Sequence, residues 1–558
     1  MNHRNWDDAS AIVSQQNRKS CLRTTKIVCT LGPSSSSEGK LKQLLDAGMG
    51  VARFNMSHGT HVSHAITLRN LRRALAHRPL STCSALLDTK GPEIRSGLLH
   101  NHRPVALRRH QHLRIVADYT YVGSAASRSV SCSYPHLALA VQRGQRILIA
   151  DGNIQLTVLE CHGSSVLCRV ETNCVLSEHK NMFVPGANVD LPTLTEKDRR
   201  DIQFAVDEGF DILSGSLVRT SHDVREIRRM LGRRGSLIRV HAKVESSRAV
   251  KNLMSVMDAA DGVHVSRGDL GMEMNLEKVF LAQKLVVGEA NMAGKPVVVA
   301  TQVLHSMLSR PQPSSAECSD IANVVIDGAD CVMLSGETAR GMFPIRAVCI
   351  MDRVCCEAER CLRYGPRRCQ SLLSCAPMAM GACEAIASSA VELSVNVGAQ
   401  LIIVVDDAGM VGQLVSKYRP EVPVLVFTGR PTVARQLTGI CRGLYSFLAR
   451  TPCAPLQCTM PIALSECWLG PCDTMVLVNA YLHSMFHHNG CSHVTPNAAH
   501  YKCNSARASV HQVALRGGAA WGGRTKSEYV GMPEEGMRPP STTLEVPTSQ
   551  RRRGNIIC

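Results

Sequence analysis

Short apolar runs alternate with helical segments over the first two-thirds of the chain, and this alternation constrains the fold more than any other feature. Helical periodicity is clearest at residues 37–47, 197–208, 222–231, 248–260 and 276–290. Eight runs have the length and β-branched content of buried strands, namely residues 25–31, 51–56, 83–88, 212–217, 237–244, 262–266, 296–300 and 331–334. Eight strands that alternate with helices predict an α/β fold of the (β/α)8 TIM-barrel type.

The alternation is interrupted once and then changes character. Between residues 96 and 186 the apolar segments are short, follow period two and are separated by Gly-rich turns, which predicts a small β-barrel inserted after the third barrel strand. Such an insertion can act as a lid that excludes water. The predicted order is an arm (1–22), the barrel (23–95 and 187–361) around the lid (96–186), a C-terminal α/β domain (362–495) and a flexible tail (496–558). The C-terminal strands are expected at 401–405, 422–427 and 474–478.

Charged side chains stand at the ends of two neighbouring strands. Lys243 and Glu245 stand at the end of the fifth run, and Asp269 follows the sixth in the sequence Arg267-Gly268-Asp269-Leu270-Gly271. The helical segment between them makes a βαβ unit, so both ends should open at the same mouth of the barrel. Two carboxylates can hold Mg²⁺ beside substrate phosphates, and a lysine can neutralise a phosphoryl group in transit. A structural ion pair is the alternative for Lys243 and Glu245, but the Gly-Asp-Leu-Gly end favours chemistry.

Four further strand ends carry polar groups. They are Arg53-Phe54-Asn55-Met56-Ser57-His58-Gly59, Asp88-Thr89-Lys90-Gly91-Pro92-Glu93-Ile94-Arg95, Ala300-Thr301-Gln302 and Leu334-Ser335-Gly336-Glu337. Any one of them is compatible with an ordinary βα turn in which Ser or Thr caps the next helix. Six such ends in the right order favour an active site.

With these motifs the sequence resembles the pyruvate kinase family. Residues 88–95, 267–271 and 333–339 carry the most specific similarity, which extends from about Arg23 to Pro344 and less closely to Val478. The resemblance implies a cytosolic glycolytic enzyme that transfers the phosphoryl group of phosphoenolpyruvate to ADP, giving pyruvate and ATP. It also implies a homotetramer, although Ser315 stands where the family has an arginine at a subunit contact.

The resemblance also assigns roles to individual residues. Glu245 and Asp269 match the Mg²⁺ ligands, and Lys243 matches the lysine that stabilises the transferring group. Gly268 and Asp269 match the amides that bind the substrate carboxylate. Arg53 matches the arginine that grips the phosphoryl group, and Thr301 lies where the enolate is protonated, by the threonine or by a bound water. The nucleotide contacts match Asn55, His58, Arg95 and Lys180. The K⁺ ligands match Asn55, Ser57, Asp88 and Thr89, and K⁺-requiring members carry glutamate at the position of Glu93.

The composition of the chain restricts the classes of binding partner and the cellular compartment that we expect. The net charge of +17 raises the possibility of a nucleic-acid partner, but the basic residues are dispersed along helices and aromatic residues make up only 4%. We therefore expect no specific nucleic-acid binding. No apolar run reaches the length of a membrane span, and the first residues do not resemble a secretory signal. The 24 cysteines include no C-x-x-C pair, which favours a reducing, cytoplasmic setting. His487, His488, Cys491 and His493 match no zinc spacing and favour a loop.

The C-terminal domain departs most from the family. Asp406 and Asp407 replace the hydroxyl-rich phosphate loop of the members that sugar bisphosphates activate, and residues 482–492 lack the tryptophan and arginine of a later loop. Carboxylates repel phosphates, so we expect no activation by fructose 1,6-bisphosphate. An inactive scaffold, or a paralogue that binds polyanions through its basic surface, is the alternative function. No catalytic position is replaced, which favours the enzyme.

Overall fold

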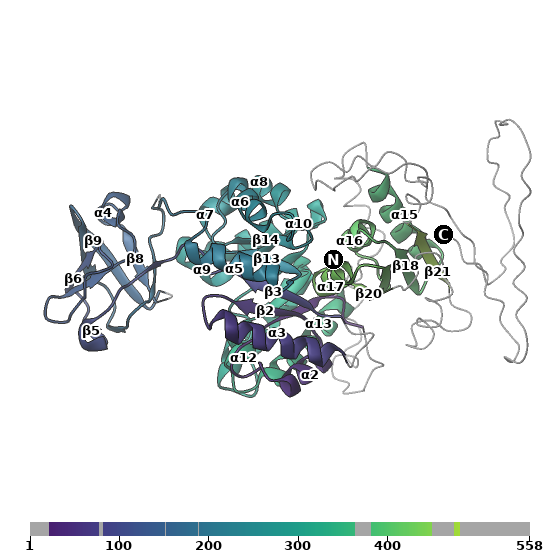
Figure 1. Cartoon of the computed structure of the whole chain (residues 1–558), viewed down its shortest axis with the longest axis horizontal. Helices are drawn as coiled ribbons and strands as arrows, with labels where there is room; N and C mark the ends of the chain where they lie inside the picture. The colour runs from purple at the N-terminus through teal and green to yellow at the C-terminus, as the bar shows by residue number, and fades with distance from the viewer. Residues whose placement is uncertain are drawn as a thin grey trace, which may run out of the picture.

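The computed structural model describes residues 22–76, 82–150, 152–187, 189–362, 381–448 and 474–479. The predicted arm up to residue 21, the tail, residues 482–492 and the group from His487 to His493 lie outside these ranges. Figure 1 shows three parts in a row, with the inserted β domain at one end, the barrel in the middle and the C-terminal unit at the other end. None of the helices in the described ranges has the length and apolar character of a bilayer span.

The central part is a closed barrel of eight parallel strands, which confirms the predicted fold and all eight predicted strands. The strand order around the barrel is β1-β17-β16-β15-β14-β13-β3-β2. The strands are β1 (Lys26–Thr30), β2 (Met49–Asn55), β3 (Ser84–Asp88), β13 (Ile212–Gly215), β14 (Arg239–Val244), β15 (Gly262–Ser266), β16 (Val297–Ala300) and β17 (Cys331–Leu334). Nearly all of their apolar side chains are buried, as continuous apolar runs in a barrel require.

Helices cover the outside of the barrel and begin at polar caps. Thr195 begins α5 with a capping box to Asp198, and Ser314 begins α11 with one to Glu317. The helices are α2 (Glu38–Asp46), α3 (His61–Ala76), α5 (Glu196–Asp207), α6 (Ser221–Leu231), α7 (Ser247–Lys251), α8 (Leu253–Ala259), α9 (Arg267–Glu273), α10 (Leu276–Ala293), α11 (Ser315–Asp327), α12 (Gly336–Ala339) and α13 (Pro344–Cys361), with the 3₁₀ turn η3 (His305–Leu308).

One predicted helix is divided. The single helix expected at 248–260 is present as α7 and α8, because Asn252 leaves helical geometry with φ −98° and ψ 15°. The side-chain amide of Asn252 donates to the Arg219 carbonyl at 3.0 Å, so a tertiary contact accompanies the break. Local propensity contains no signal for this contact.

The inserted part is a curled β domain, as predicted. Its seven-stranded sheet has the order β4-β12-β8-β9-β10-β6-β7, and β5 pairs with β11. A bridge between Ser96 and Cys132, next to β4 and β7, joins the two edges of the large sheet. The elements are β4 (Ile94–Arg95), η2 (His100–His102), β5 (Val105–Leu107), β6 (His112–Val116), β7 (Ser129–Ser131), α4 (Leu137–Ala140), β8 (Arg146–Ile149), β9 (Ile154–His162), β10 (Ser165–Val170), β11 (Cys174–Leu176) and β12 (Asn181–Phe183).

The C-terminal part is a parallel four-stranded sheet with the order β20-β19-β18-β21. The three predicted strands are present as β18 (Leu401–Val405), β19 (Val424–Thr428) and β21 (Met475–Asn479), with helices α15 (Ala382–Asn396), α16 (Met410–Lys417) and α17 (Pro431–Ile440). The fourth strand, β20 (Leu444–Leu448), was not predicted, because it is a short mixed segment that is recognisable as a strand only by its pairing with β19.

The C-terminal unit packs against the amino end of the barrel. Lys26, at the start of β1, donates to the Leu444 carbonyl at 2.6 Å, and Arg435 lies 2.8 Å from the Asp211 carboxylate. Val28 and Val51 of the barrel interior belong to the same buried cluster as the C-terminal core. The C-terminal unit therefore closes one end of the barrel and leaves the carboxyl ends of the strands to the lid.

Candidate active site

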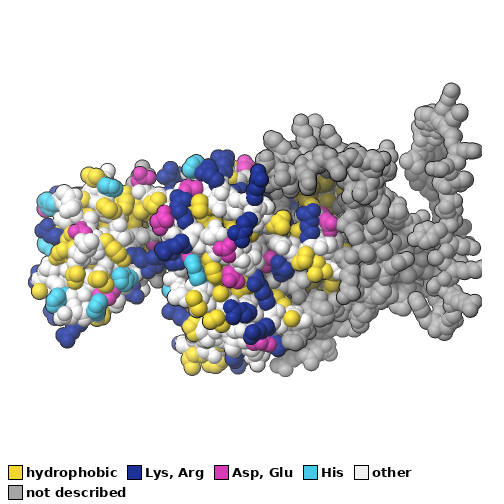
Figure 2. Space-filling model, viewed as in Figure 1, with side chains coloured by type: hydrophobic (Ala, Val, Ile, Leu, Met, Phe, Trp, Pro, Cys, Tyr) yellow, Lys and Arg dark blue, Asp and Glu magenta, His cyan; other side chains and the backbone are white. Residues whose placement is uncertain are grey.

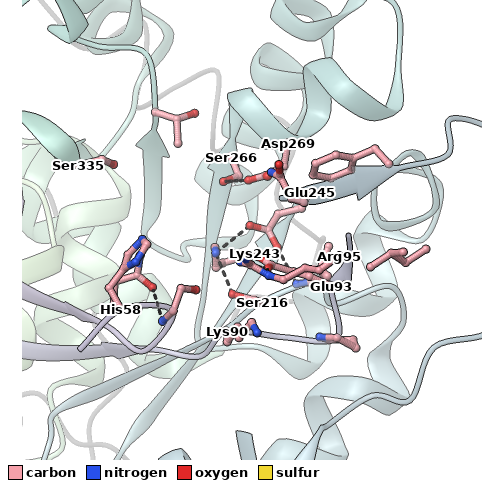
Figure 3. Close-up of a pocket in the computed structure, with 18 of the residues that line it drawn as sticks. His58, Lys90, Glu93, Arg95, Ser216, Lys243, Glu245, Ser266, Asp269 and Ser335 are labelled. Atoms are coloured by element: carbon pink, nitrogen blue, oxygen red, sulfur yellow. Dashed lines mark hydrogen bonds and ion pairs between the residues drawn. The ribbon is translucent and has the colours of Figure 1, made fainter. Parts of the chain in front are cut away.

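A cavity of about 1300 Å³ lies between the carboxyl ends of the barrel strands and the inserted domain. All the predicted site residues line it except Asp88, Thr89 and Gly268. Each of these three contacts the lining: Asp88 lies against Lys243, Thr89 bonds Ser216 and Gly268 bonds Thr301. Figure 3 shows His58, Arg95, Lys243, Glu245 and Asp269 around this cavity, contributed by several different strand ends. The fold thus collects residues from position 53 to position 301 into one place.

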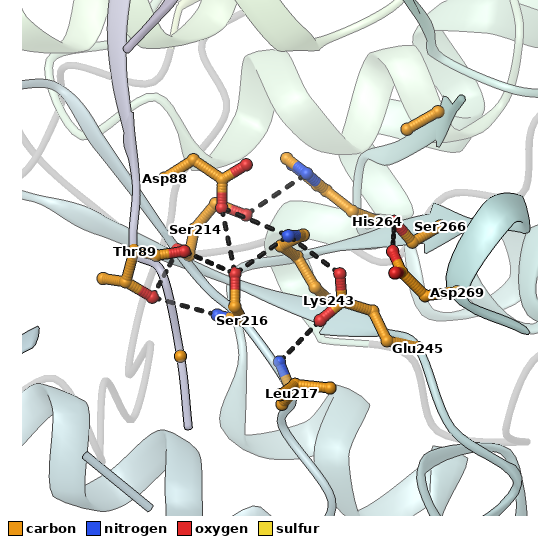
Figure 4. A network of polar contacts seen from close by, with 12 residues as sticks. Asp88, Thr89, Ser214, Ser216, Leu217, Lys243, Glu245, His264, Ser266 and Asp269 are labelled. Atoms are coloured by element: carbon orange, nitrogen blue, oxygen red, sulfur yellow. Dashed lines mark hydrogen bonds and ion pairs between the residues drawn. The ribbon is translucent and has the colours of Figure 1, made fainter. Parts of the chain in front are cut away.

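Lys243 is the centre of a polar network at the cavity floor (Figure 4). Its ammonium lies 2.8 Å from Glu245 Oε1 and 3.4 Å from Asp88 Oδ1. It also donates to Ser216 Oγ at 2.8 Å. Ser216 Oγ is within 3.2 Å of Asp88 Oδ1 and 2.6 Å of the Thr89 carbonyl. The lysine is therefore held in a fixed position by groups from three strands.

Charge complementarity keeps this network ionised. Burial favours the neutral form of Lys243, but the carboxylates of Asp88 and Glu245 raise the lysine pKa above its usual value. Burial likewise opposes ionisation of Asp88, but Lys243 and Arg53 hold the pKa of Asp88 below its usual value. Arg53 donates from Nε to Asp88 Oδ2 at 2.7 Å and from Nη1 to Thr30 Oγ1 at 2.8 Å. Both cations are thus preorganised around one buried aspartate.

Glu245 and Asp269 form a pair of neighbouring carboxylates. Glu245 Oε2 accepts a hydrogen bond from the Leu217 amide at 2.6 Å, and Asp269 Oδ2 accepts one from Ser266 Oγ at 2.8 Å. Burial and the adjacent charge of Glu245 raise the pKa of Asp269 to about 7. Two buried carboxylates that repel each other are a donor set suited to a hard divalent cation. The described residues contain no cluster of three or more His, Cys, Asp or Glu side chains of the kind that holds a transition metal.

Thr301 and Gly268 lie in contact at the ends of β16 and β15. The Gly268 amide donates to Thr301 Oγ1 at 2.8 Å, while Thr301 and Gln302 have positive φ angles of 69° and 55°. Arg267 holds this strained turn, because its guanidinium donates to the carbonyls of both residues and binds Asp320 at 2.7 Å. Strained backbone held by several contacts is typical of functional sites.

Oxygen-rich side chains gather at the ends of β2 and β3, where Asn55 and Asp88 are paired across the strands. Asn55 Oδ1 accepts a hydrogen bond from the Ser57 amide at 3.0 Å, and Thr89 Oγ1 accepts one from the Ser216 amide at 3.1 Å. Glu93 binds the Arg95 guanidinium, with Nε 2.8 Å from Oε2. These hydroxyl, amide and carboxylate oxygens are ligands of the kind that a monovalent cation accepts.

The predicted nucleotide contacts come from both sides of the cavity. Asn55 ends β2 and His58 follows it, whereas Arg95 belongs to β4 and Lys180 precedes β12 of the inserted domain. Burial and the guanidinium groups of Arg95 and Arg340 lower the pKa of His58. The inserted domain therefore contributes cations to the same cavity that holds Lys243.

Ser216, which bonds Lys243, Asp88 and Thr89 at once, was not among the residues predicted from the sequence. It follows the fourth barrel strand, and the end of that strand could have been inspected for polar residues in the same way as the other six strand ends.

Two buried barrel histidines were also not predicted. His264 Nδ1 lies 3.2 Å from Ser214 Oγ, and His264 Nε2 lies 3.1 Å from His241 Nδ1. Burial lowers the pKa of His241 to about 3 and that of His264 well below its usual value, so both are neutral beneath the site.

A polar, charge-balanced cavity at the carboxyl end of a (β/α)8 barrel, covered by an inserted domain, defines a barrel enzyme that acts on anionic substrates. The comparisons with known proteins make this class specific. Residues 22–348 match the family model of the pyruvate kinase barrel domain, and residues 384–485 match that of the pyruvate kinase alpha/beta domain. The chain therefore belongs to the pyruvate kinase family.

Individual relatives agree with this assignment over most of the chain. Pyruvate kinase of Eimeria tenella is 44% identical over 431 residues, which cover 76% of this chain and 80% of the relative. The cytosolic isozyme of Solanum tuberosum is 45% identical over 421 residues, which cover 75% and 82%. The crystal structure of Cryptosporidium parvum pyruvate kinase superposes with a TM-score of 0.76 at 41% identity and covers 82% of this chain and 96% of that protein.

Proposed function

We propose that this chain transfers the phosphoryl group of phosphoenolpyruvate to ADP and yields pyruvate and ATP. The main support for the proposal is the position of Lys243. Its ammonium is fixed between Glu245 and Asp88 on the floor of a cavity that the inserted domain covers. A preorganised cation in a water-poor site stabilises charge on a transferring phosphoryl group. Turnover in an assay coupled to lactate dehydrogenase tests it, with the Lys243 variant described in the Discussion. An inactive scaffold would show no turnover above background.

The other site residues take complementary roles in this proposal. Arg53 binds the phosphoryl group, and the amides of Gly268 and Asp269 bind the substrate carboxylate, for which the Gly268 amide exchanges its present bond to Thr301 Oγ1. Thr301, or a water that it holds, delivers the proton to the methylene carbon. Asn55, His58, Arg95 and Lys180 bind the nucleotide, with Lys180 and Arg95 supplied by the lid.

Two cations complete the proposed site. Glu245 and Asp269 would hold Mg²⁺, which supplies Lewis-acid stabilisation of the developing charge. Asn55, Ser57, Asp88 and Thr89 would hold K⁺. The burial of Asp269 and the adjacent charge of Glu245, which together raise the pKa of Asp269, support the first assignment. The oxygen donors at the paired ends of β2 and β3 support the second. The cytosolic name of the potato relative supports a cytoplasmic location, which fractionation of cells that express the chain would test.

We propose that the chain assembles as a homotetramer, and α10 offers one interface. Its side chains Leu276, Phe280, Leu281 and Leu285 are 73%, 54%, 55% and 46% exposed. An exposed apolar stripe of this kind marks a protein–protein contact. Light scattering should give a particle of four chains, and Phe280→Glu/Leu281→Glu should give a smaller one. Val62→Glu, at an equally exposed apolar position on α3, is the control and should leave the size unchanged. A parent protein of one chain would contradict the proposal.

We further propose that fructose 1,6-bisphosphate does not activate this enzyme. In addition to the charge repulsion expected from the sequence, a carboxylate already occupies the backbone amides that a phosphate would bind. The carboxylate of Asp406 is buried and accepts four backbone amides, those of Ala408, Gly409, Val411 and Gly412, at 2.7–3.1 Å. The donors that a phosphate would need at the start of α16 are already bound. Asp407, which accepts from the Gly429 amide at 2.7 Å, remains as the like charge.

The expected loss of binding free energy for the sugar bisphosphate follows from these contacts. One like-charge contact costs about 4 kcal/mol at 4 Å and an effective dielectric of 20. A micromolar site has about 8 kcal/mol of binding free energy in all, and four amides are no longer available to supply it. Saturation curves for phosphoenolpyruvate with and without the sugar bisphosphate should therefore superimpose. A shift of the curve to lower substrate concentration would show that the effector binds elsewhere.

A further inference from the structure

The fold gathers cations at the free end of the inserted domain, although the sequence shows them dispersed along the whole chain. From Arg95 to Ala117 the chain has no aspartate or glutamate but has five arginines and four histidines. We call Arg108, Arg109, His110, His112, Arg114 and Arg128 the lid cation band. Figure 2 shows Lys, Arg and His side chains along the outer end of this domain, away from the barrel.

Strand geometry places the band on one outer face. In β6 the side chains alternate, so that His112 and Arg114 are exposed while Leu113 and Ile115 are buried in the domain core. The turn Arg108–His110 leads directly into this strand. Arg128 lies beside it, because the Arg114 amide donates to the Arg128 carbonyl at 2.9 Å. The band is therefore a continuous surface feature.

The arginines of the band lack the ion pair that a neighbouring arginine forms within the described part of the chain. Among the residues that the structure describes, no carboxylate forms an ion pair with Arg108, Arg109, Arg114 or Arg128, whereas the nearby Arg169 is paired with Glu171 at 2.9 Å. The Arg114 side chain bonds only Ser165 Oγ, at 3.3 Å, within the described part of the chain. Guanidinium groups present a planar fork that matches phosphate oxygens. Four guanidinium groups without a carboxylate partner among the described residues therefore suit an external polyanion.

We propose that the lid cation band docks the phosphate backbone of single-stranded RNA without sequence preference. Tyr121 lies close to Arg114, with its hydroxyl 2.6 Å from Ser129 Oγ, and offers a ring on which a base can stack. A membrane surface, which needs apolar insertion beside the cations, is the alternative that the vesicle measurement below separates from RNA.

The band is independent of the proposed catalytic function. None of its residues lines the cavity that holds Lys243. Charge reversal in the band should therefore leave turnover and the Michaelis constant for phosphoenolpyruvate unchanged.

The test is fluorescence anisotropy of a labelled single-stranded RNA 20-mer titrated with the full chain over a range of KCl concentrations. Arg108→Glu/Arg114→Glu should weaken binding at least tenfold at low salt. Because each phosphate contact on a single strand contributes about 0.7 to the dependence of log K on log salt, the slope should fall by about 1.4. Arg69→Glu/Arg73→Glu on α3 reverses the same number of exposed charges elsewhere. This control should change the RNA affinity by less than twofold and should leave the salt dependence of log K unchanged.

Other outcomes overturn the proposal. Equal weakening by both double variants would show a response to net charge alone, and RNA binding that is unaffected by the band variant would place the contact elsewhere. Loss of binding to vesicles with anionic phospholipid, without loss of RNA binding, would make the band a membrane surface. Arg108→Gln/Arg114→Gln, with thermal unfolding as a check on the fold, guards against damage by the introduced carboxylates.

Discussion

Replacement of Lys243 by methionine will lower turnover by at least about a thousandfold while the fold persists. One preorganised donor at a site of developing charge is worth about 3–4 kcal/mol, and the loss of a full positive charge costs at least the upper end of that range, which corresponds to about a thousandfold in rate. The ammonium has no substitute, because its contacts with Glu245, Asp88 and Ser216 converge on this single atom. The measurement is kcat in the coupled assay at saturating phosphoenolpyruvate, ADP, Mg²⁺ and K⁺.

Two controls separate chemistry from folding in this experiment. Asp88 keeps its bond to Arg53 in the variant, so the network should not collapse, and thermal unfolding checks this. Lys40→Met makes the same substitution at an exposed position of α2 and should retain parental kcat. A folded Lys243→Met protein with near-parental turnover would remove Lys243 from the proposed mechanism and leave the scaffold function to be considered.

Removal of K⁺ will abolish most of the activity, and a fixed ammonium at position 93 will restore much of it. In sodium or tetramethylammonium buffer, parental turnover should fall by a factor on the order of 10², the effect of one missing preorganised charge. Glu93 directly precedes β4 and binds Arg95, a proposed nucleotide contact, and it lines the same cavity as Asn55 and Ser57 of the proposed cation site. Glu93→Lys should turn over at similar rates with and without K⁺.

The control for this prediction is Glu93→Gln, which removes the carboxylate but supplies no cation. It should remain dependent on K⁺, and its Michaelis constant for ADP reports the cost of freeing Arg95 from its partner. Full activity of the parent enzyme in K⁺-free buffer would eliminate the potassium site formed by Asn55, Ser57, Asp88 and Thr89.

Local sequence was sufficient for the barrel and for the position of its active end. Each barrel strand is a continuous apolar run because both of its faces are buried, and such a run is visible without any partner. The polar residues at the ends of the runs, among them Lys243, Asp269 and Thr301, had to meet because the carboxyl ends of parallel strands open on the same side.

Only the tertiary structure decided which of these groups touch and how they are charged. Ser216 contacts Lys243 across 27 residues of sequence, and Asp88 sits between two cations from other strands. Three other features were likewise decided by tertiary structure. Strand β20 and the helix break at Asn252 depend on neighbours distant in the chain, and the four amides that bind Asp406 are brought together by the path of a loop. Periodicity records which face of an element is buried, but hydrogen bonds and pKa values depend on distances that exist only after packing.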